Sequence, residues 1–140
     1  MRWFYAVCMG WCLLPLWTQA QDLTANDRVA IRTVIEQQIE AFRRDDAAAA
    51  FSYASAAIQQ QFETPERFMR MVKTAYQPVY RPRRVVFQEI DETASVPIQP
   101  VLLVGPDGVP VIALYPMRQE TDGVWRIDGC YLKAIKQERL

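Results

Sequence analysis

Two prolines divide this chain into a half that can be helical and a half that reads as strands. Pro78 and Pro82 lie in the short segment 77–82, and each lacks a backbone donor and pushes its predecessor towards extended geometry. Before them, apolar residues recur every three or four positions, as on a helix with one buried face. After them, runs of Val, Ile, Leu and aromatic residues favour strands. The pattern predicts one α+β domain in which the helices come first.

Capping signals define where the predicted helices begin. Thr24 and Asp27 have the spacing of a capping box, and Thr64 precedes a proline at a first helical position. The pair Asp45-Asp46 interrupts the first helix and is suited to cap the second. The predicted helices run from Thr24 to this interruption, over 47–53 with a shorter continuation at 56–62 after a bend, and from Thr64 to near Tyr76.

Glycine-bearing turns link the predicted strands. The segments 106–108 and 121–123 are Pro-Asp-Gly and Thr-Asp-Gly, which are typical of short connections between adjacent antiparallel strands. Prolines in and beside the strands are expected at ends, edges or bulges, where they bend the sheet. The helices should therefore pack on a curved antiparallel sheet of about four strands, at 85–93, 98–104, 109–118 and 124–135.

Alternation along the last predicted strand separates its two faces. Trp125, Ile127, Gly129 and Tyr131 fall on one side, which is predicted to face the helices, and Asp128 and Cys130 fall on the other.

The first twenty residues have the features of a removable signal peptide. Arg2 precedes the almost wholly apolar segment 3–17, and Thr18-Gln19-Ala20 offers small residues to a signal peptidase. Cleavage is predicted after Ala20, which leaves residues 21–140 as one exported domain, periplasmic or extracellular. The alternatives are a retained membrane anchor, for which the apolar run is short, and a lipoprotein at Cys12, where the preceding tryptophan is too bulky. The membrane is then involved only during export.

Charge and composition exclude several classes of function. Basic and acidic side chains number 16 each and are dispersed, so no nucleic-acid partner is predicted. The chain has no histidine, which removes Ser-His-Asp and Cys-His catalysis and the commonest zinc ligand. We predict no cofactor and no metal site.

Loss of the leader leaves Cys130 as the only cysteine, so no intramolecular disulfide is predicted. Two interpretations of this thiol remain open. It is either reactive, including towards a second chain, or a small buried hydrophobe.

Several segments of the chain carry a family resemblance. Three helices followed by a curved four-stranded sheet resemble the cone-shaped fold shared by nuclear transport factor 2 and ketosteroid isomerase. More specifically, the sequence is similar to an uncharacterised bacterial family, domain of unknown function 4864. The similar stretches are Ala41-Phe42-Arg43-Arg44-Asp45-Asp46, Thr64-Pro65-Glu66-Arg67-Phe68, Tyr80-Arg81-Pro82, Leu103-Val104-Gly105-Pro106-Asp107-Gly108, and Gly123-Val124-Trp125-Arg126-Ile127 with Gly129-Cys130. The resemblance implies a fold and no particular activity.

A pocket at the open end of the sheet is the first candidate site. A helix-backed curved sheet tends to enclose such a pocket, and aromatic residues could line it or simply fill the core. The aromatic candidates are Tyr53, Phe62, Phe68, Tyr76, Tyr80, Tyr115 and Trp125.

Two polar arrangements supply further candidates. The wider fold can run acid–base chemistry without histidine, and Asp128 with Tyr115 is the pair proposed for it; the alternative is a solvated Asp128 paired with Arg126 or Arg118. Arg81, Arg83 and Arg84 beside Tyr80 form a basic cluster that suits an anion, or is a solvated loop.

The favoured interpretation is a non-enzymatic domain that binds a small molecule or a protein partner. The predicted ligand-binding residues are Tyr76, Tyr80, Arg81, Arg83, Arg84 and Trp125. The alternative is a cofactor-free enzyme of isomerase or dehydratase type. A homodimer formed through the exposed face of the sheet is a third possibility.

Overall fold

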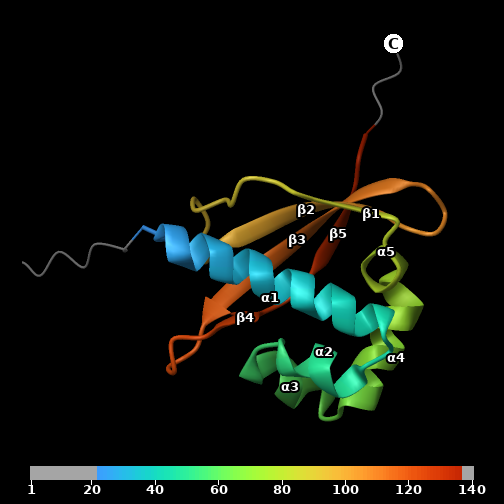
Figure 1. Ribbon diagram of the computed structural model, residues 1–140, viewed down its shortest axis with the longest axis horizontal. Coiled ribbons are helices and arrows are strands. Elements are labelled where there is room, and N and C mark those ends of the chain that lie inside the picture. The colour runs from blue at the N-terminus through green and yellow to red at the C-terminus, as the bar shows by residue number, and fades with distance from the viewer. Residues whose placement is uncertain (1–21, 137–140) are drawn as a thin grey trace, which may run out of the picture.

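The computed structural model describes residues 22–136, and in this part of the chain five helices precede five strands (Figure 1). The predicted leader and its cleavage site at Ala20 lie outside the described residues. The helices are α1 (Ala25–Arg43), α2 (Ala47–Ser52), α3 (Ala56–Phe62), α4 (Pro65–Ala75) and α5 (Gln77–Tyr80). The strands are β1 (Arg84–Phe87), β2 (Ile98–Val104), β3 (Pro110–Gln119), β4 (Trp125–Ile127) and β5 (Tyr131–Ala134). None of the helices between residues 22 and 136 has the length and apolar character required to cross a membrane.

The predicted helix starts are confirmed. Thr24 accepts a hydrogen bond from the backbone N–H of Asp27 at 3.0 Å, and the Asp27 carboxylate accepts one from the Thr24 N–H at 3.0 Å. Thr64 caps α4 in front of a proline in its first turn. These caps involve only residues within three positions of one another, so the sequence alone was enough to predict them.

The segment after α4 is more helical than predicted. Residues 77–80 form the single turn α5, so the prediction that the helical half of the chain ends near Tyr76 is wrong for these four residues. Pro78 is tolerated because it lies in the first turn, where its missing N–H would have no intrahelical partner. The predicted continuation at 56–62 is the separate helix α3, which is capped by the Ser55 side chain.

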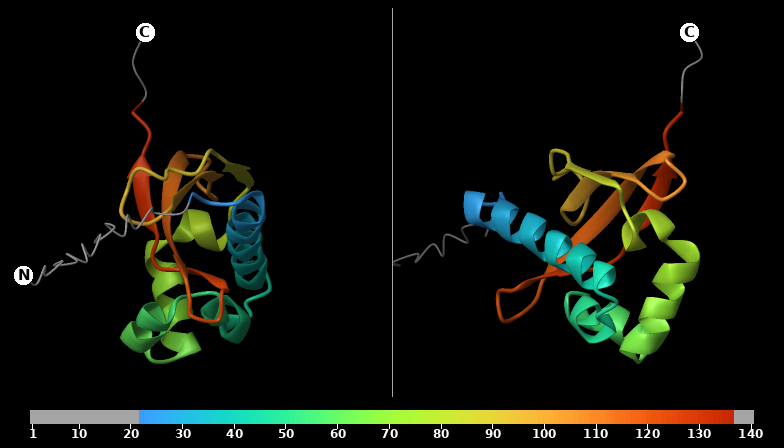
Figure 2. Two further views of the ribbon diagram at one scale, coloured as in Figure 1. Left: turned by 90° about the vertical axis from the view of Figure 1, so that its left-hand side faces the viewer. Right: turned by 45° about the vertical axis from the view of Figure 1, so that its right-hand side comes forward.

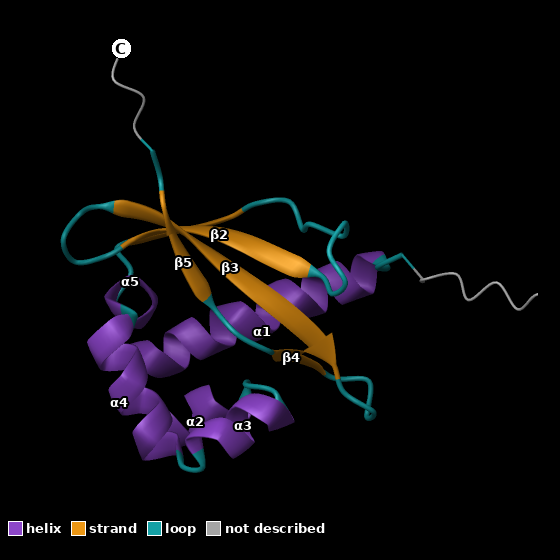
Figure 3. Ribbon diagram, turned by 180° about the vertical axis from the view of Figure 1, so that it is seen from behind, coloured by secondary structure: helices purple, strands orange, loops and turns teal. Residues whose placement is uncertain are grey.

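The strands form one antiparallel sheet in the order β1-β2-β3-β4, with β5 also paired to β3. Its long central pairing joins β2 to β3 from Ile98↔Pro116 to Val104↔Pro110. The sheet is strongly curved, and α1 lies across it while α2, α3 and α4 gather beyond one end (Figures 2 and 3). The α+β prediction, with helices packed on a curved antiparallel sheet, is confirmed.

A bulge divides the last predicted strand in two. Ile127 pairs with Met117, and Tyr131 pairs with Leu114, so three residues on this side oppose two on β3. One extra residue reverses the alternation of side chains beyond it. Ile127 therefore faces the core, whereas Tyr131 is 66% exposed, and the prediction that both share the helix-covered face is wrong.

Helices and sheet meet in one apolar core. It is formed by the apolar face of α1 and by alternate residues of β2 and β3, and its fully buried members include Ile31, Ile35, Phe42, Val101, Leu103, Ala113 and Tyr115.

Candidate ligand-binding cavity

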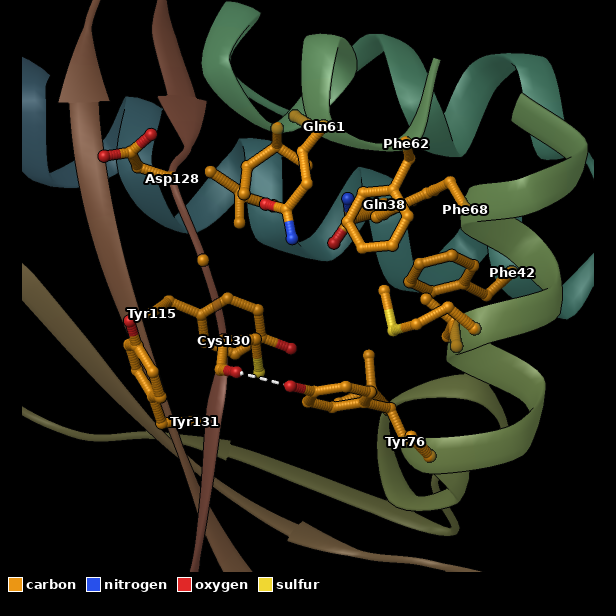
Figure 4. Close-up of a pocket in the computed structure, with 18 residues that line it drawn as sticks. Gln38, Phe42, Gln61, Phe62, Phe68, Tyr76, Tyr115, Asp128, Cys130 and Tyr131 are labelled. Carbon is orange, nitrogen blue, oxygen red and sulfur yellow. Dashed lines mark hydrogen bonds between the residues drawn. The ribbon is translucent and has the colours of Figure 1, made fainter. Parts of the chain in front are cut away.

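A cavity of about 460 Å³ lies between the helices and the bulged strand (Figure 4). Helices α1, α3 and α4 supply one wall, and β3 with the link between β4 and β5 supplies the other. Most of the lining side chains are apolar or aromatic. They are Gln38, Phe42, Ala54, Ile58, Gln61, Phe62, Phe68, Met71, Val72, Ala75, Tyr76, Val79, Tyr115, Ile127, Asp128, Gly129, Cys130 and Tyr131.

Packed aromatic rings hold the helical wall in place. The Phe68 ring lies 6.0 Å from that of Phe42, 5.4 Å from that of Phe51 and 5.6 Å from that of Phe62, measured between centroids. Such tilted and edge-on pairs stabilise beyond the area they bury. Phe68 thus joins three helices around the cavity.

Tyr76 and Tyr115 approach the bulge from opposite walls. The Tyr76 hydroxyl donates a hydrogen bond to the Cys130 carbonyl at 3.0 Å (Figure 4). The Tyr115 hydroxyl is fully buried beside the Cys130 thiol, a weak acceptor, and forms no hydrogen bond to an oxygen or nitrogen among residues 22–136. Burial raises the pKa of both phenols, that of Tyr115 well above its usual range, so both keep their protons at neutral pH.

Asp128 and Tyr115 line the same cavity without meeting. The Asp128 carboxylate accepts a hydrogen bond from the Ser55 hydroxyl at 2.6 Å, and in Figure 4 it points away from the Tyr115 ring. Ser55 in turn caps α3 by accepting from the Ile58 N–H at 3.3 Å. Neither sequence-based expectation for Asp128 describes this geometry: no acid–base pair is assembled with Tyr115.

An arginine partner for Asp128 is likewise missing. Within the described residues, neither Arg118 nor Arg126 forms an ion pair with it. The serine on the helical side takes the place that an arginine was expected to occupy.

Cys130 forms part of the cavity wall beside both tyrosines. Burial raises the pKa of its thiol to about 12, so almost no thiolate is present at neutral pH. Since the thiolate is the nucleophile, this environment favours the interpretation of Cys130 as a small buried hydrophobe.

Three of the predicted aromatic residues lie elsewhere. Trp125 and Tyr53 line a separate groove beside α1, where the Trp125 indole N–H donates to the Asp27 carboxylate at 3.1 Å. Tyr80 donates its hydroxyl to Asp45. Tyr53, Tyr80 and Trp125 therefore lie outside the cavity wall, whereas Tyr76 lines it together with Phe62, Phe68 and Tyr115.

Sequence reasoning missed the polar residue Gln38 in the cavity wall. It lies on the buried face of α1, and its side-chain amide donates to the Ala50 carbonyl at 3.1 Å. A glutamine in register with the isoleucines of an apolar helix face was the available signal, because a buried amide requires partners.

The predicted basic cluster is not assembled as an anion site. The Arg81 guanidinium binds the Asp45 carboxylate at 3.1 Å and stacks on the Tyr80 ring 3.9 Å from its centroid. Arg83 and Arg84 are exposed, and neither forms an ion pair within the described residues. The carboxylate that Arg81 recognises is thus internal.

Among residues 22–136, no group of three or more metal-ligating side chains is brought together.

A family model described as a domain of unknown function (DUF4864) matches residues 24–140, beginning at the cap of α1. No curated protein and no solved structure matches the chain significantly.

Proposed function

This chain belongs to the family of domains of unknown function DUF4864, and from the geometry of its cavity we propose that it binds a small, mainly apolar molecule. The observation that carries the proposal is the aromatic-lined cavity of about 460 Å³ between helices and sheet. Ligand sites in proteins are typically concave, apolar and about 300–1,000 Å³ in volume, with a few polar groups that orient the ligand.

The position of the polar groups supports binding better than catalysis. Asp128 is held by Ser55 on the far side from Tyr115, and Cys130 carries its proton at neutral pH. A general base has to reach the proton that it removes, directly or through one water. We therefore place the non-enzymatic interpretation before the isomerase-like one.

We further propose that the domain acts after export and belongs to the nuclear-transport-factor-2-like superfamily. Residues 1–20 carry the pattern of a removable leader. Helices followed by a curved antiparallel sheet that encloses a cavity support the superfamily assignment.

Titration with N-phenyl-1-naphthylamine tests the binding proposal, because this neutral dye fluoresces in apolar surroundings. The domain from Gln21 onwards is suitable, since its core lies within residues 22–136. We expect saturable binding that Ala75→Phe weakens by about tenfold or more, or ~1.4 kcal/mol. Ala75 is an exposed residue of the cavity wall at the end of α4, where a phenyl ring would narrow the entrance.

Ala48→Phe is the matched control, because Ala48 is an exposed helical alanine outside the cavity wall. It should bind the dye as the unsubstituted domain does. Absence of saturable binding, or the same affinity in both variants, would contradict the proposal.

A further inference from the structure

We infer that the ligand of this cavity is uncharged and carries a hydrogen-bond acceptor, such as a carbonyl oxygen, for the Tyr115 hydroxyl. This inference rests on the proposed function and narrows it to a chemical class. It has two independent parts, the charge of the ligand and the position of its acceptor.

That the ligand is uncharged is inferred from the residues that form the cavity wall. Among residues 22–136, no lysine or arginine lines the cavity. The basic residues Arg70 and Lys73 of α4 lie on its exposed side, while Phe68, Met71 and Val72 face the cavity. A carboxylate or phosphate would therefore lose its hydration without gaining a cation, and burial of an unpaired charge is costly.

A cationic ligand is no better served. In the described part of the wall Asp128 is the one acidic residue, and its carboxylate is bound to Ser55 and turned away from Tyr115. With neither sign of charge complemented inside, the cavity selects an uncharged molecule.

The acceptor on the ligand is inferred from the hydrogen bonds that the buried polar groups of the wall form or lack. The Gln38 amide donates to Ala50, and the Tyr76 hydroxyl donates to Cys130. The Tyr115 hydroxyl has only the Cys130 thiol beside it, a weak acceptor, and forms no hydrogen bond to an oxygen or nitrogen among the described residues. An unsatisfied buried hydroxyl is costly, so a ligand acceptor that pairs with it is bound more tightly than an apolar group at that place.

Tyr76 controls access to this hydroxyl. Tyr115 and Tyr76 both adjoin Cys130, and the Tyr115 hydroxyl oxygen is shielded from solvent. The Tyr76 side chain is only partly buried, and one hydrogen bond from its hydroxyl holds it to the strand. The inference requires that the Tyr76 side chain move aside, so that a ligand oxygen can reach the Tyr115 hydroxyl.

Three ten-carbon compounds test the charge. On the domain from Gln21, 2-decanone, decanoate and decylamine should compete for bound N-phenyl-1-naphthylamine, with the ketone at least about tenfold more effective than either ion. Equal or better competition by decanoate or decylamine overturns the inference and leaves the proposed function standing. Competition by none of them also overturns it. A failure of the dye itself to bind contradicts the proposed function.

The variant Tyr115→Phe tests the acceptor, because it removes one oxygen and keeps the ring. Ketone affinity should fall about two- to tenfold, as expected for the loss of one neutral hydrogen bond. Dye affinity should stay the same, since the dye offers no carbonyl oxygen. A purely structural role of Tyr115 would instead lower both affinities together.

Tyr53→Phe is the matched control. Tyr53 lies outside the cavity wall, in the separate groove beside α1. It should leave ketone affinity unchanged. An unaltered ketone affinity in Tyr115→Phe, or the same loss in both variants, overturns the acceptor role.

Discussion

Asp45 is the residue that ties the α1–α2 turn to the end of α4 and to α5. Its carboxylate accepts from the Tyr80 hydroxyl and pairs with Arg81 at 3.1 Å and with Lys73 at 3.7 Å. Its backbone φ is 53°, in the left-handed region that Asp and Asn tolerate better than most residues. Two of these partners, Tyr80 and Arg81, belong to the cluster that the sequence suggested for an external anion.

Protonation of this cluster should make stability depend on pH. The Tyr80 hydrogen bond, followed by Arg81 and Lys73, lowers the pKa of Asp45 below its ordinary 3.8, and the Asp45 hydrogen bond raises the pKa of Tyr80 above 10.0. The Asp45 contribution is therefore fully present above the ordinary value and lost as pH falls through the lowered one. The Tyr80 contribution is present below its ordinary value and lost as pH rises through the raised one.

The variant Asp45→Asn should unfold at a lower urea concentration than the unsubstituted domain at pH 7. Asparagine keeps the shape and the left-handed backbone but loses the charge, so the difference should shrink when the pH falls below about 4. Urea unfolding curves at pH 7 and pH 3 measure this difference in the unfolding midpoint between the variant and the unsubstituted domain. Asp107→Asn, in an exposed turn, is the control and should show no such change. A difference that is the same at both pH values would rule out the carboxylate as its source.

At the scale of elements, the packing of α5 against the end of β2 depends on a glycine. A Cβ atom at Gly105 would lie 3.0 Å from the Cα of Pro78 in α5. This distance is shorter than most real Cβ contacts, and the nearest atom is backbone, so α5 would have to shift by a few tenths of an ångström. Gly105 therefore lets α5 lie close to the sheet. Arg81, which follows α5 directly, is positioned with it.

Gly105→Ala should lower the free energy of unfolding by about 1–3 kcal/mol, the usual cost of an overpacked contact. Urea unfolding followed by Trp125 fluorescence measures this, since Trp125 is the only tryptophan after Ala20. Adding Pro78→Ala should not restore stability, because the clash is with the backbone. An unchanged midpoint in Gly105→Ala, or full rescue by the second substitution, would show that α5 can move away freely.

At the scale of the whole molecule, export remains the prediction on which the cellular setting depends. The core that the structure describes is formed by residues between 22 and 136. With the leader removed, Cys130 is the only cysteine, so the domain should need no disulfide for stability.

Mass spectrometry of the protein recovered from outside the cytoplasm should find Gln21 at the amino terminus. Ala20→Phe should block this processing, because signal peptidase requires a small residue there. A reducing agent should leave the thermal midpoint of the processed domain unchanged. Recovery of the unsubstituted protein with Met1 attached would argue for a retained anchor.

Local chemistry by itself determined the order of elements and most of their ends. The Thr24–Asp27 capping box, the Thr64-Pro65 helix start and the two glycine turns involve residues within a few positions of one another, so they could be read along the chain. Periodicity similarly identified the faces of α1 and α4 that enter the core.

The tertiary structure alone decided which residues meet at the site. Ser55 reaches Asp128 across 73 positions, Tyr80 reaches Asp45 across 35, and the bulge after Ile127 turns Tyr131 outwards. A bulge depends on how two strands pair, and a hydrogen bond between distant segments depends on how they pack. Neither leaves a periodic signal in the sequence, which is why the cavity was predictable as an aromatic pocket but its polar geometry was not.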